Sequence, residues 1–246
     1  MREDQKVLPW TDPRPTWDRK SGMFLQTSFI SRRAFALGTA GWLGCAAPAR
    51  ALPVQRSGAL LFDIWRKQRR IGTHELHFSV SNGTLSVDIA VRVNVLFGPI
   101  AISHYRLDGI EKWRDGQVFH VATTTNNDGE ADDMRADRHP QGLIVQGSKV
   151  QTYVAPANAL PATHWNQVEL NGPWINLQNG RLLHPSVKRL GADKVRVANG
   201  DILLARHYRV SGDFALQLWY GYHRQWLSLA FTGKDGSNIT YLRRDG

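Results

Sequence analysis

The sequence holds one cysteine and three methionines in 246 residues. A single cysteine, Cys45, excludes an intramolecular disulfide framework and a structural zinc site made of cysteines. Long apolar runs are missing too. The uncharged stretch at 34–49 is shorter than the roughly 20 apolar residues of a membrane-spanning helix, and Gly38, Gly41 and Gly44 dilute it. We therefore expect no transmembrane span in the mature chain.

Motifs that reveal an enzyme class are absent as well. The chain contains no G-x-S-x-G nucleophile elbow, no phosphate-binding loop and no dinucleotide fingerprint. His74 and His77 stand three positions apart in a predicted strand, which puts them on opposite faces and argues against a shared metal ion. The acidic stretch 128–133 lacks the spacing of a calcium loop and is interpreted as a solvated turn. No metal site is predicted, and any cofactor stays unknown.

The charge balance is basic, with 31 Lys and Arg against 21 Asp and Glu and a net charge of +10. Eight of the basic residues and four of the acidic ones precede residue 52, so residues 52–246 keep a net charge of +6. The densest basic cluster, 66–70, is interpreted as a solvated turn between two strands, although such clusters also bind nucleic acid or anionic lipid heads. We expect no nucleic-acid partner, because the start of the chain predicts export.

Residues 1–51 are predicted to form an N-terminal extension and a signal peptide. Paired arginines stand directly before the short apolar stretch, which ends in a small-x-small cleavage pattern. The residues that define this signal are Arg32, Arg33, Phe35, Ala49 and Ala51. The arrangement resembles a twin-arginine export signal. It implies the twin-arginine export machinery as a partner and a periplasmic or otherwise exported location.

Three alternatives stay open for this leader. The first is a general secretory signal that happens to carry two arginines. In the second, the chain starts at Met23 rather than Met1, which leaves a compact leader. In the third, Leu43-Gly44-Cys45 acts as the end of a lipoprotein box, and the mature chain is anchored to lipid through Cys45.

Apolar residues alternate with polar ones along much of the remaining chain. The clearest case runs from Leu85 to Val95, where apolar residues occupy every second position, as in a strand with one buried face. Asn82-Gly83, directly before it, is a strong hairpin signal. Strands are predicted at 60–64, 71–80, 85–95, 102–113, 117–125, 143–145, 150–154, 202–210, 214–220, 226–231 and 239–242.

Evenly spaced strands joined by turns favour an all-β, mainly antiparallel fold. We predict a single curved sheet that forms a barrel or half-barrel, with a sandwich as the alternative. A short helical or irregular segment is expected around 160–191. Residues 52–246 are predicted to form a single β-rich domain, which is long enough to bury a sizeable core.

Short motifs along this β-rich region carry a resemblance to a known family. They are Gly58-x-Leu60-x-Phe62-Asp63-Ile64, Ile71-Gly72-x-His74, Glu111-x-Trp113-x-Asp115-Gly116, the TTTNNDG turn at 123–129, Pro161-Ala162-Thr163-His164-Trp165 and Leu218-Trp219-Tyr220. The pattern resembles an uncharacterised family of exported bacterial proteins, a domain of unknown function, over most of 58–244. That resemblance implies no activity, substrate or catalytic residue. The pattern is also similar to exported half-barrel domains, including periplasmic lipoprotein carriers, at the level of the fold alone.

Three residues are weak candidates for acid–base groups. His164 lies beside Trp165 on a loop, where it can contact a ligand or pin the loop to the sheet. Glu111 shares a strand face with Trp113, and an aromatic face can raise the pKa of a carboxyl. Asp63 lies on the opposite face from its apolar neighbours and is expected to be solvated, unless both faces are covered.

The preferred interpretation is an exported protein that binds or carries an apolar ligand, either a small molecule or a lipid. A curved sheet can enclose such a ligand, and tryptophans line binding sites because they combine contact area with a polar handle. The predicted ligand-binding residues are Trp113, His164, Trp165 and Trp219. The alternatives are an exported enzyme acting on an envelope lipid or related apolar substrate, and a non-enzymatic envelope partner protein. A roomy apolar interior favours the carrier, converging titratable groups favour the enzyme, and a packed interior favours the partner protein.

Overall fold

The computed structural model describes residues 52, 54, 58–97, 100–233 and 235–244, all within one compact unit. The predicted signal residues lie outside the described residues, so the export signal and its cleavage site stay predictions. Most of the described chain is strand, and one short 3-10 helix, η1, spans Gln167–Asn171. No helix in this part of the chain is long and apolar enough to cross a membrane.

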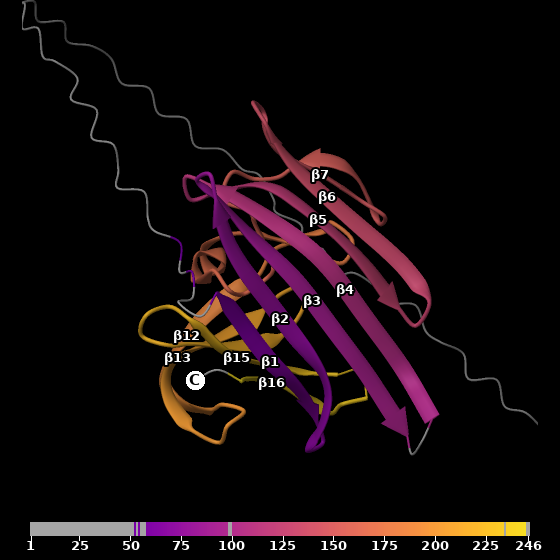
Figure 1. Cartoon of the computed structure of the whole chain (residues 1–246), viewed down its shortest axis with the longest axis vertical. Coiled ribbons are helices and arrows are strands. Elements are labelled where there is room, and N and C mark those ends of the chain that lie inside the picture. The colour runs from indigo at the N-terminus through magenta and orange to yellow at the C-terminus, as the bar shows by residue number, and fades with distance from the viewer. Residues whose placement is uncertain (1–51, 53, 55–57, 98–99, 234, 245–246) are drawn as a thin grey trace, which may run out of the picture. The chain divides into compact units, whose positions relative to one another are not determined.

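Thirteen strands form one antiparallel sheet, in the order β12-β13-β14-β15-β16-β1-β2-β3-β4-β5-β6-β7-β8. They are β1 (Ala59–Arg66), β2 (Arg69–Ser81), β3 (Thr84–Phe97), β4 (Ile100–Arg114), β5 (Gln117–Asn127), β6 (Glu130–His139), β7 (Gly142–Gly147), β8 (Val150–Val154), β12 (Ser186–Arg196), β13 (Ile202–Ser211), β14 (Leu216–Tyr220), β15 (Trp226–Thr232) and β16 (Asn238–Arg243). Figure 1 shows β1 to β7 side by side in a curved, twisted band. The predicted all-β, mainly antiparallel curved sheet is confirmed.

Tight turns join consecutive strands. Asn82 and Gly83 have φ angles of 48° and 71°, the left-handed values that a type I′ hairpin turn requires and that glycine adopts without a steric penalty. Lys67 and Gln68 also take left-handed φ values, 46° and 61°, between β1 and β2. The basic cluster 66–70 therefore is a turn between two strands, as predicted.

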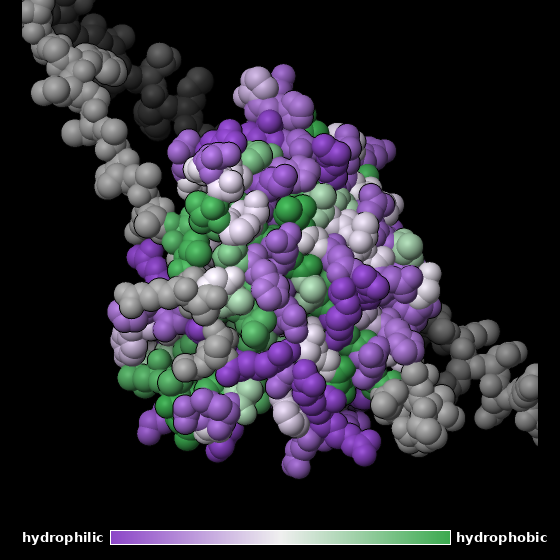
Figure 2. Space-filling model, viewed as in Figure 1, coloured by the Kyte–Doolittle hydropathy of each residue, from purple (hydrophilic) through white to green (hydrophobic). Residues whose placement is uncertain are grey.

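Side chains alternate between the two faces of the sheet. Val87, Ile89 and Val91 of β3 are buried, which confirms the period of two. His74 is buried while His77 is exposed, so these two histidines lie on opposite faces as expected. Figure 2 shows hydrophilic residues over much of the face in view, with hydrophobic residues scattered between them. The outward face is largely polar and the inward face supplies the main core. A second, smaller buried cluster lies on β12, β13 and β15 and consists of Val195, Ala205 and Leu227.

Two strands of the sheet were not predicted. β6 crosses most of the acidic stretch 128–133, which was interpreted as a solvated turn, and only positions 128 and 129 form the turn. Asp132 is buried because it shares the inward face of β6 with Met134 and Ala136. β12 is an edge strand whose side chains are mostly exposed, so no regular buried period marks it in the sequence.

Residues 155–185 connect β8 to β12 and form a segment that we call the plug. Its elements are β9 (Leu160–Pro161), η1, β10 (Trp174–Ile175) and β11 (Leu182–Leu183), and its strands form a separate small sheet in the order β11-β10-β9. Trp165, Trp174 and Ile175 are fully buried in the core that the inward face of the main sheet supplies. The predicted short helical or irregular segment around 160–191 is confirmed, although β12 begins within that range.

The plug lies against β7 and β8 at close range. The Tyr153 hydroxyl donates to the Gly180 carbonyl oxygen at 2.8 Å. Gly147 stands so near that a Cβ there would meet the Asn179 carbonyl oxygen at 2.2 Å. Only glycine permits this approach of two backbones, so Gly147 helps to set the position of the plug.

Candidate functional site

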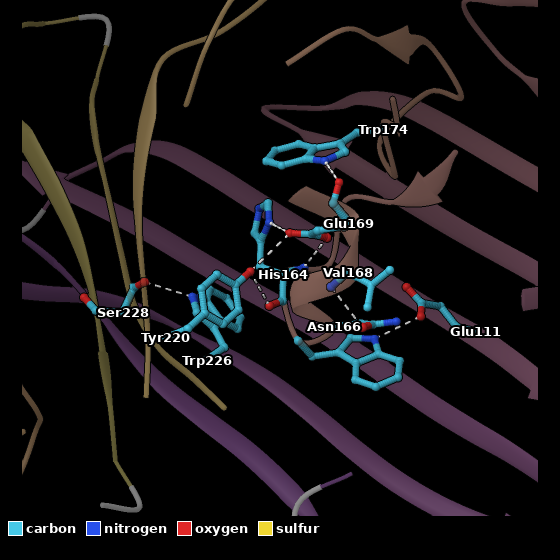
Figure 3. Close-up of polar contacts among 10 residues, drawn as sticks. Glu111, His164, Asn166, Val168, Glu169, Trp174, Tyr220, Trp226 and Ser228 are labelled. Carbon is cyan, nitrogen blue, oxygen red and sulfur yellow. Dashed lines mark hydrogen bonds and ion pairs between the residues drawn. The ribbon is translucent and has the colours of Figure 1, made fainter. Parts of the chain in front are cut away.

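A tight turn in the plug holds the best candidate residue, His164. This histidine has a left-handed φ of 65°, and its backbone N–H donates to Glu169 Oε2 at 3.0 Å. Its imidazole Nδ1 lies 2.6 Å from Glu169 Oε1 (Figure 3). Trp174 Nε1 donates to the backbone carbonyl of Glu169 at 2.7 Å. Glu169 is only 1% exposed, so its carboxylate closes the turn from inside.

Hydrogen bonds tie this turn to two separated parts of the main sheet. The Tyr220 hydroxyl of β14 donates to the His164 carbonyl oxygen at 2.9 Å. Trp165 Nε1 donates to Glu111 Oε2 of β4 at 3.0 Å, and Trp113 Nε1 donates to the same oxygen at 2.8 Å. The plug thus links β4 to β14, which stand far apart in the strand order.

Burial shifts the protonation of two groups in this interior. It raises the pKa of the Glu111 carboxyl from 4.5 to about 7, against the opposing effect of the N–H donors of Trp113 and Trp165. Burial, followed by the charge of His164, lowers the pKa of His74 from 6.5 to about 3. At neutral pH the interior therefore contains a neutral His74, and burial favours the protonated form of Glu111.

This interior brings titratable groups together but leaves them packed. The His164 ring lies 5.2 Å from the Trp174 ring and 5.5 Å from the Trp226 ring, measured between centroids. Neither of the two cavities described for the chain is lined by His164, Glu169 or Glu111. The arrangement can hold the plug in place and influence the protonation of the interior.

The larger cavity measures about 780 Å³ and is lined by residues of β4 to β6 together with residues of β12 and β13. One wall comes from the β4–β5 turn and β6, and the opposite wall comes from β12 and β13. Plug residues on and beside η1 line it as well, and Gln167 Nε2 donates to the Tyr208 hydroxyl of β13 at 3.0 Å. The cavity therefore lies where plug residues meet two parts of the main sheet that are far apart in the strand order.

Side chains of two kinds line this cavity. Trp113, Val118, Leu160, Leu170 and Val187 supply apolar surface. The charged lining residues are Arg138, Arg189, Arg206 and Arg224. No aspartate, glutamate or lysine is among the lining residues, so the cavity has one sign of charge.

The structure brings four of the predicted site residues together and separates two others. Glu111, Trp113 and Trp165 form one hydrogen-bonded group beside His164, and of these only Trp113 reaches the large cavity. Trp219 lies elsewhere: its ring stacks on the His207 ring at 4.4 Å, and its Nε1 donates to Asp193 at 2.9 Å. No described cavity is lined by Trp219.

Asp63 is the second residue that lies apart from this group. It faces outward from β1, as alternation predicted, but it is not freely solvated. Its side chain is 15% exposed because Arg70 and Arg244 bind its carboxylate at 2.7 and 2.9 Å. Asp63 therefore serves as an ion-pair centre of the outer face.

Sequence reasoning missed Glu169, Tyr220 and the cavity arginines. Glu169 follows His164 by five residues, and an irregular turn and a short 3-10 helix separate them. Such a segment has no regular period from which the contact could be predicted. Arg206 and Tyr208 stand two positions apart on a predicted strand and therefore lie on the same face. This spacing could have indicated one wall of the cavity. Arg189 lies on β12, which the sequence analysis did not identify as a strand.

These features define a β-barrel-like protein whose open sheet is filled by a buried, hydrogen-bonded plug. The chain belongs to the family described as Domain of unknown function (DUF6134), whose model matches residues 62–244. The expected resemblance to a domain of unknown function is thereby confirmed. No curated protein matches the chain.

One solved structure supports the fold. It is the beta-barrel-like protein of domain of unknown function DUF1849 from Brucella abortus, with 12% sequence identity and a TM-score of 0.52. The similarity covers 75% of this chain and 94% of that chain. At this identity the likeness concerns the fold alone.

Proposed function

We propose that the protein is an exported binding protein whose ligand is apolar over at least part of its surface. The observation that carries this proposal is the 780 Å³ cavity lined by the plug, β4 to β6, β12 and β13. Ligand pockets measure about 300–1,000 Å³ and combine apolar walls with a few polar groups. This cavity has such a volume and such a mixed lining.

The walls of the cavity are rigid enough to be preformed. Trp113 is 2% exposed and Val118 is 1% exposed, so both are held by the core behind them. Gln167 and Tyr208 join the plug to β13 across the lining. A preformed wall lowers the entropy cost of binding, since few side chains must be ordered when the ligand enters.

Export forms the second part of the proposal. Arg32 and Arg33 before a short apolar stretch support passage through the twin-arginine machinery and a periplasmic location. That route carries folded chains, so a ligand bound inside the cell would cross the membrane with the protein.

The packing around His164 favours binding over catalysis. An enzyme needs its acid–base group within hydrogen-bond reach of a substrate. His164 instead contacts Glu169, Trp174 and Trp226 and lines neither described cavity. The exported-enzyme alternative therefore has less support than the binding protein.

The test is native mass spectrometry of the protein exported from cells under its own leader, compared with its denatured mass. We expect a retained adduct in the native spectrum. The denatured mass also identifies the mature N-terminus and distinguishes cleavage after Ala51 from acylation at Cys45.

Two variants make the test specific to the cavity. Ala157→Trp fills the cavity from an exposed lining position and is expected to remove the adduct. Ala131→Trp adds the same side chain at an exposed position of β6 outside the lining and is expected to keep it. A bare native mass for the unmodified chain, or an adduct that persists in Ala157→Trp, would contradict binding in this cavity.

A further inference from the structure

We propose that the ligand is a single-chain amphiphile with an anionic head, a carboxylate or a phosphate, which binds the arginines of the cavity. This inference rests on the proposed function, since it assigns the ligand class of the same cavity. Arg138, Arg189, Arg206 and Arg224 come from four elements, namely β6, β12, β13 and the β14–β15 turn. Four positive charges that converge from separate elements form a site for negative charge.

These arginines differ from six other arginines of the described chain, which are paired with acids. Many outer-face arginines bind an acid: Arg66 binds Asp235, Arg70 and Arg244 bind Asp63, Arg92 and Arg106 bind Asp108, and Arg135 binds Asp137. Within the described residues, none of the four cavity arginines forms such an ion pair. Arg69 and Arg209 also form no ion pair within the described residues, so the distinguishing feature of the four cavity arginines is that they line one cavity without an acid.

The contacts of the cavity arginines leave donors free. Arg138 Nε donates to the Val118 carbonyl oxygen at 2.8 Å, which fixes that side chain against the cavity wall. The guanidinium of Arg206 lies 5.5 Å from the centre of the Tyr222 ring, a cation–π contact that uses the face of the group. A guanidinium carries five N–H donors in a planar fork that matches carboxylate and phosphate oxygens. Both arginines therefore keep N–H groups for an anion.

Exposure varies across the lining and orients the ligand. Arg138, Arg189 and Arg224 are exposed and Arg206 is half-buried. The apolar lining residues Trp113 and Val118 are buried, and Leu160, Leu170 and Val187 are half-buried. The anionic head is therefore expected at the open side, with the alkyl chain directed to the buried wall. A free inorganic anion would leave this apolar wall unused.

The experiment measures the affinity of the purified, exported protein for decyl phosphate, decanoate, decanol and inorganic phosphate by isothermal titration calorimetry. Each ten-carbon probe is kept below its aggregation concentration. We expect decyl phosphate and decanoate to bind at least about ten-fold more tightly than decanol, because hydrogen bonds to a charged group strengthen the complex. Inorganic phosphate, which lacks the chain, is expected to bind more weakly than decyl phosphate.

Matched variants assign the effect to the arginines. Arg189→Gln combined with Arg206→Gln removes two cavity charges and is expected to weaken decyl phosphate binding about ten-fold or more, with decanol binding unchanged. The control is Lys188→Gln combined with Arg209→Gln. Lys188 and Arg209 pair in register on the same two strands, are exposed and do not line the cavity. The control should leave both affinities as they are, and thermal unfolding checks that each variant folds.

The possible results separate this inference from the proposed function. Equal affinities for decanol and decyl phosphate would overturn the anionic head and leave the binding function standing. Failure of every ten-carbon probe to bind would overturn both. Inorganic phosphate binding as tightly as decyl phosphate would show a free-anion site and overturn the amphiphile. An equal loss in the control pair would overturn the role of the cavity arginines.

Discussion

The plug interior and the cavity beside it use charged residues in opposite ways. In the interior, Glu169 receives the backbone N–H and the imidazole of His164, and Glu111 receives two tryptophan N–H groups. In the cavity, Arg189 and Arg224 have no acidic partner among the described residues. Both regions lie within a few residues of each other on the plug, since Asn166 and Gln167 line the cavity while His164 does not.

This difference indicates which charged residues of the fold are available to a ligand. A buried charge without a partner costs several kcal/mol, so the interior acids depend on donors within the protein. Glu111 Oε2 has two such donors, whereas Glu111 Oε1 is buried without one, which agrees with the raised pKa of this carboxyl. An exposed arginine pays little for lacking a partner, so the protein can leave it for a ligand. Interior groups are thus expected to control stability, and cavity groups to control affinity.

The largest effect is expected from Trp165→Ala. The Trp165 ring packs 5.4 Å from Phe78 and 5.3 Å from Trp113, and its N–H satisfies Glu111. Removing it should lower the free energy of unfolding by about 3–5 kcal/mol, through the cavity it leaves and the lost donor. Urea unfolding followed by circular dichroism measures the change. Trp165→Phe keeps most of the packing and should lose less. A loss below 1 kcal/mol in the alanine variant would show that the plug does not stabilise the sheet.

The next effect concerns Glu111→Gln and depends on pH. The pKa of Glu111 is 4.5 in its usual state and about 7 when buried, so the folded chain binds the extra proton between these values. The contribution of Glu111 to the free energy of unfolding therefore decreases as the pH rises from 4.5 to 7. At about 1.4 kcal/mol per pH unit, the total decrease is about 3 kcal/mol. Glutamine removes that loss. The free energy of unfolding of Glu111→Gln, relative to that of the wild type, should increase as the pH rises over this range. A pH-independent difference would contradict a protonated Glu111 in the folded state.

His74→Phe should give the opposite pH dependence. The pKa of His74 is 6.5 in its usual state and about 3 when buried, so the unfolded chain binds the extra proton between pH 3 and 6.5. Wild-type stability from this group is lost as the pH falls below 6.5, by about 2 kcal/mol at pH 5. Phenylalanine fits the aromatic surroundings of Trp226 and Tyr241 and carries no such loss. The advantage of the variant should grow as the pH falls, and chemical unfolding at pH 5 and pH 8 measures it.

The smallest effect is expected from Trp219→Phe on the outer face. The variant keeps a ring that can stack on His207 and loses the hydrogen bond to Asp193, a group with ample solvent. The free energy of unfolding should fall by about 1 kcal/mol or less. Ligand affinity measured by calorimetry should not change. A clear loss of affinity would instead support Trp219 as a ligand-binding residue, as the sequence analysis predicted.

Much of the fold prediction rested on the alternation of apolar and polar residues and on residues that favour tight turns. Asn82-Gly83 marked its hairpin, and the inward face of β3 followed from the period of two. β12 was missed because an exposed edge strand has no buried period to read. The shared face of Glu111 and Trp113 also followed from alternation, and the hydrogen bond between them agrees with it.

The remainder of the candidate site depends on contacts between segments far apart in sequence. Tyr220 reaches His164 across 56 positions, and Trp165 reaches Glu111 across 54. Arg138 of β6 and Arg224 of the β14–β15 turn line one cavity although they are 86 positions apart in the sequence. Local sequence periodicity cannot predict such contacts, because they depend on how the whole chain folds.

The pairing of β16 with β1 has a consequence for the order of events in the cell. Phe62 lies opposite Arg243 in this pairing, so one edge of β1 has no partner until β16 has been synthesised. A contact of such long sequence separation carries a high loop-closure entropy and slows folding. A ribosome-bound or truncated chain would present β1 with an unpaired edge, to which chaperones or other strands can bind. β16 must therefore be synthesised before this edge of β1 can be paired within the chain.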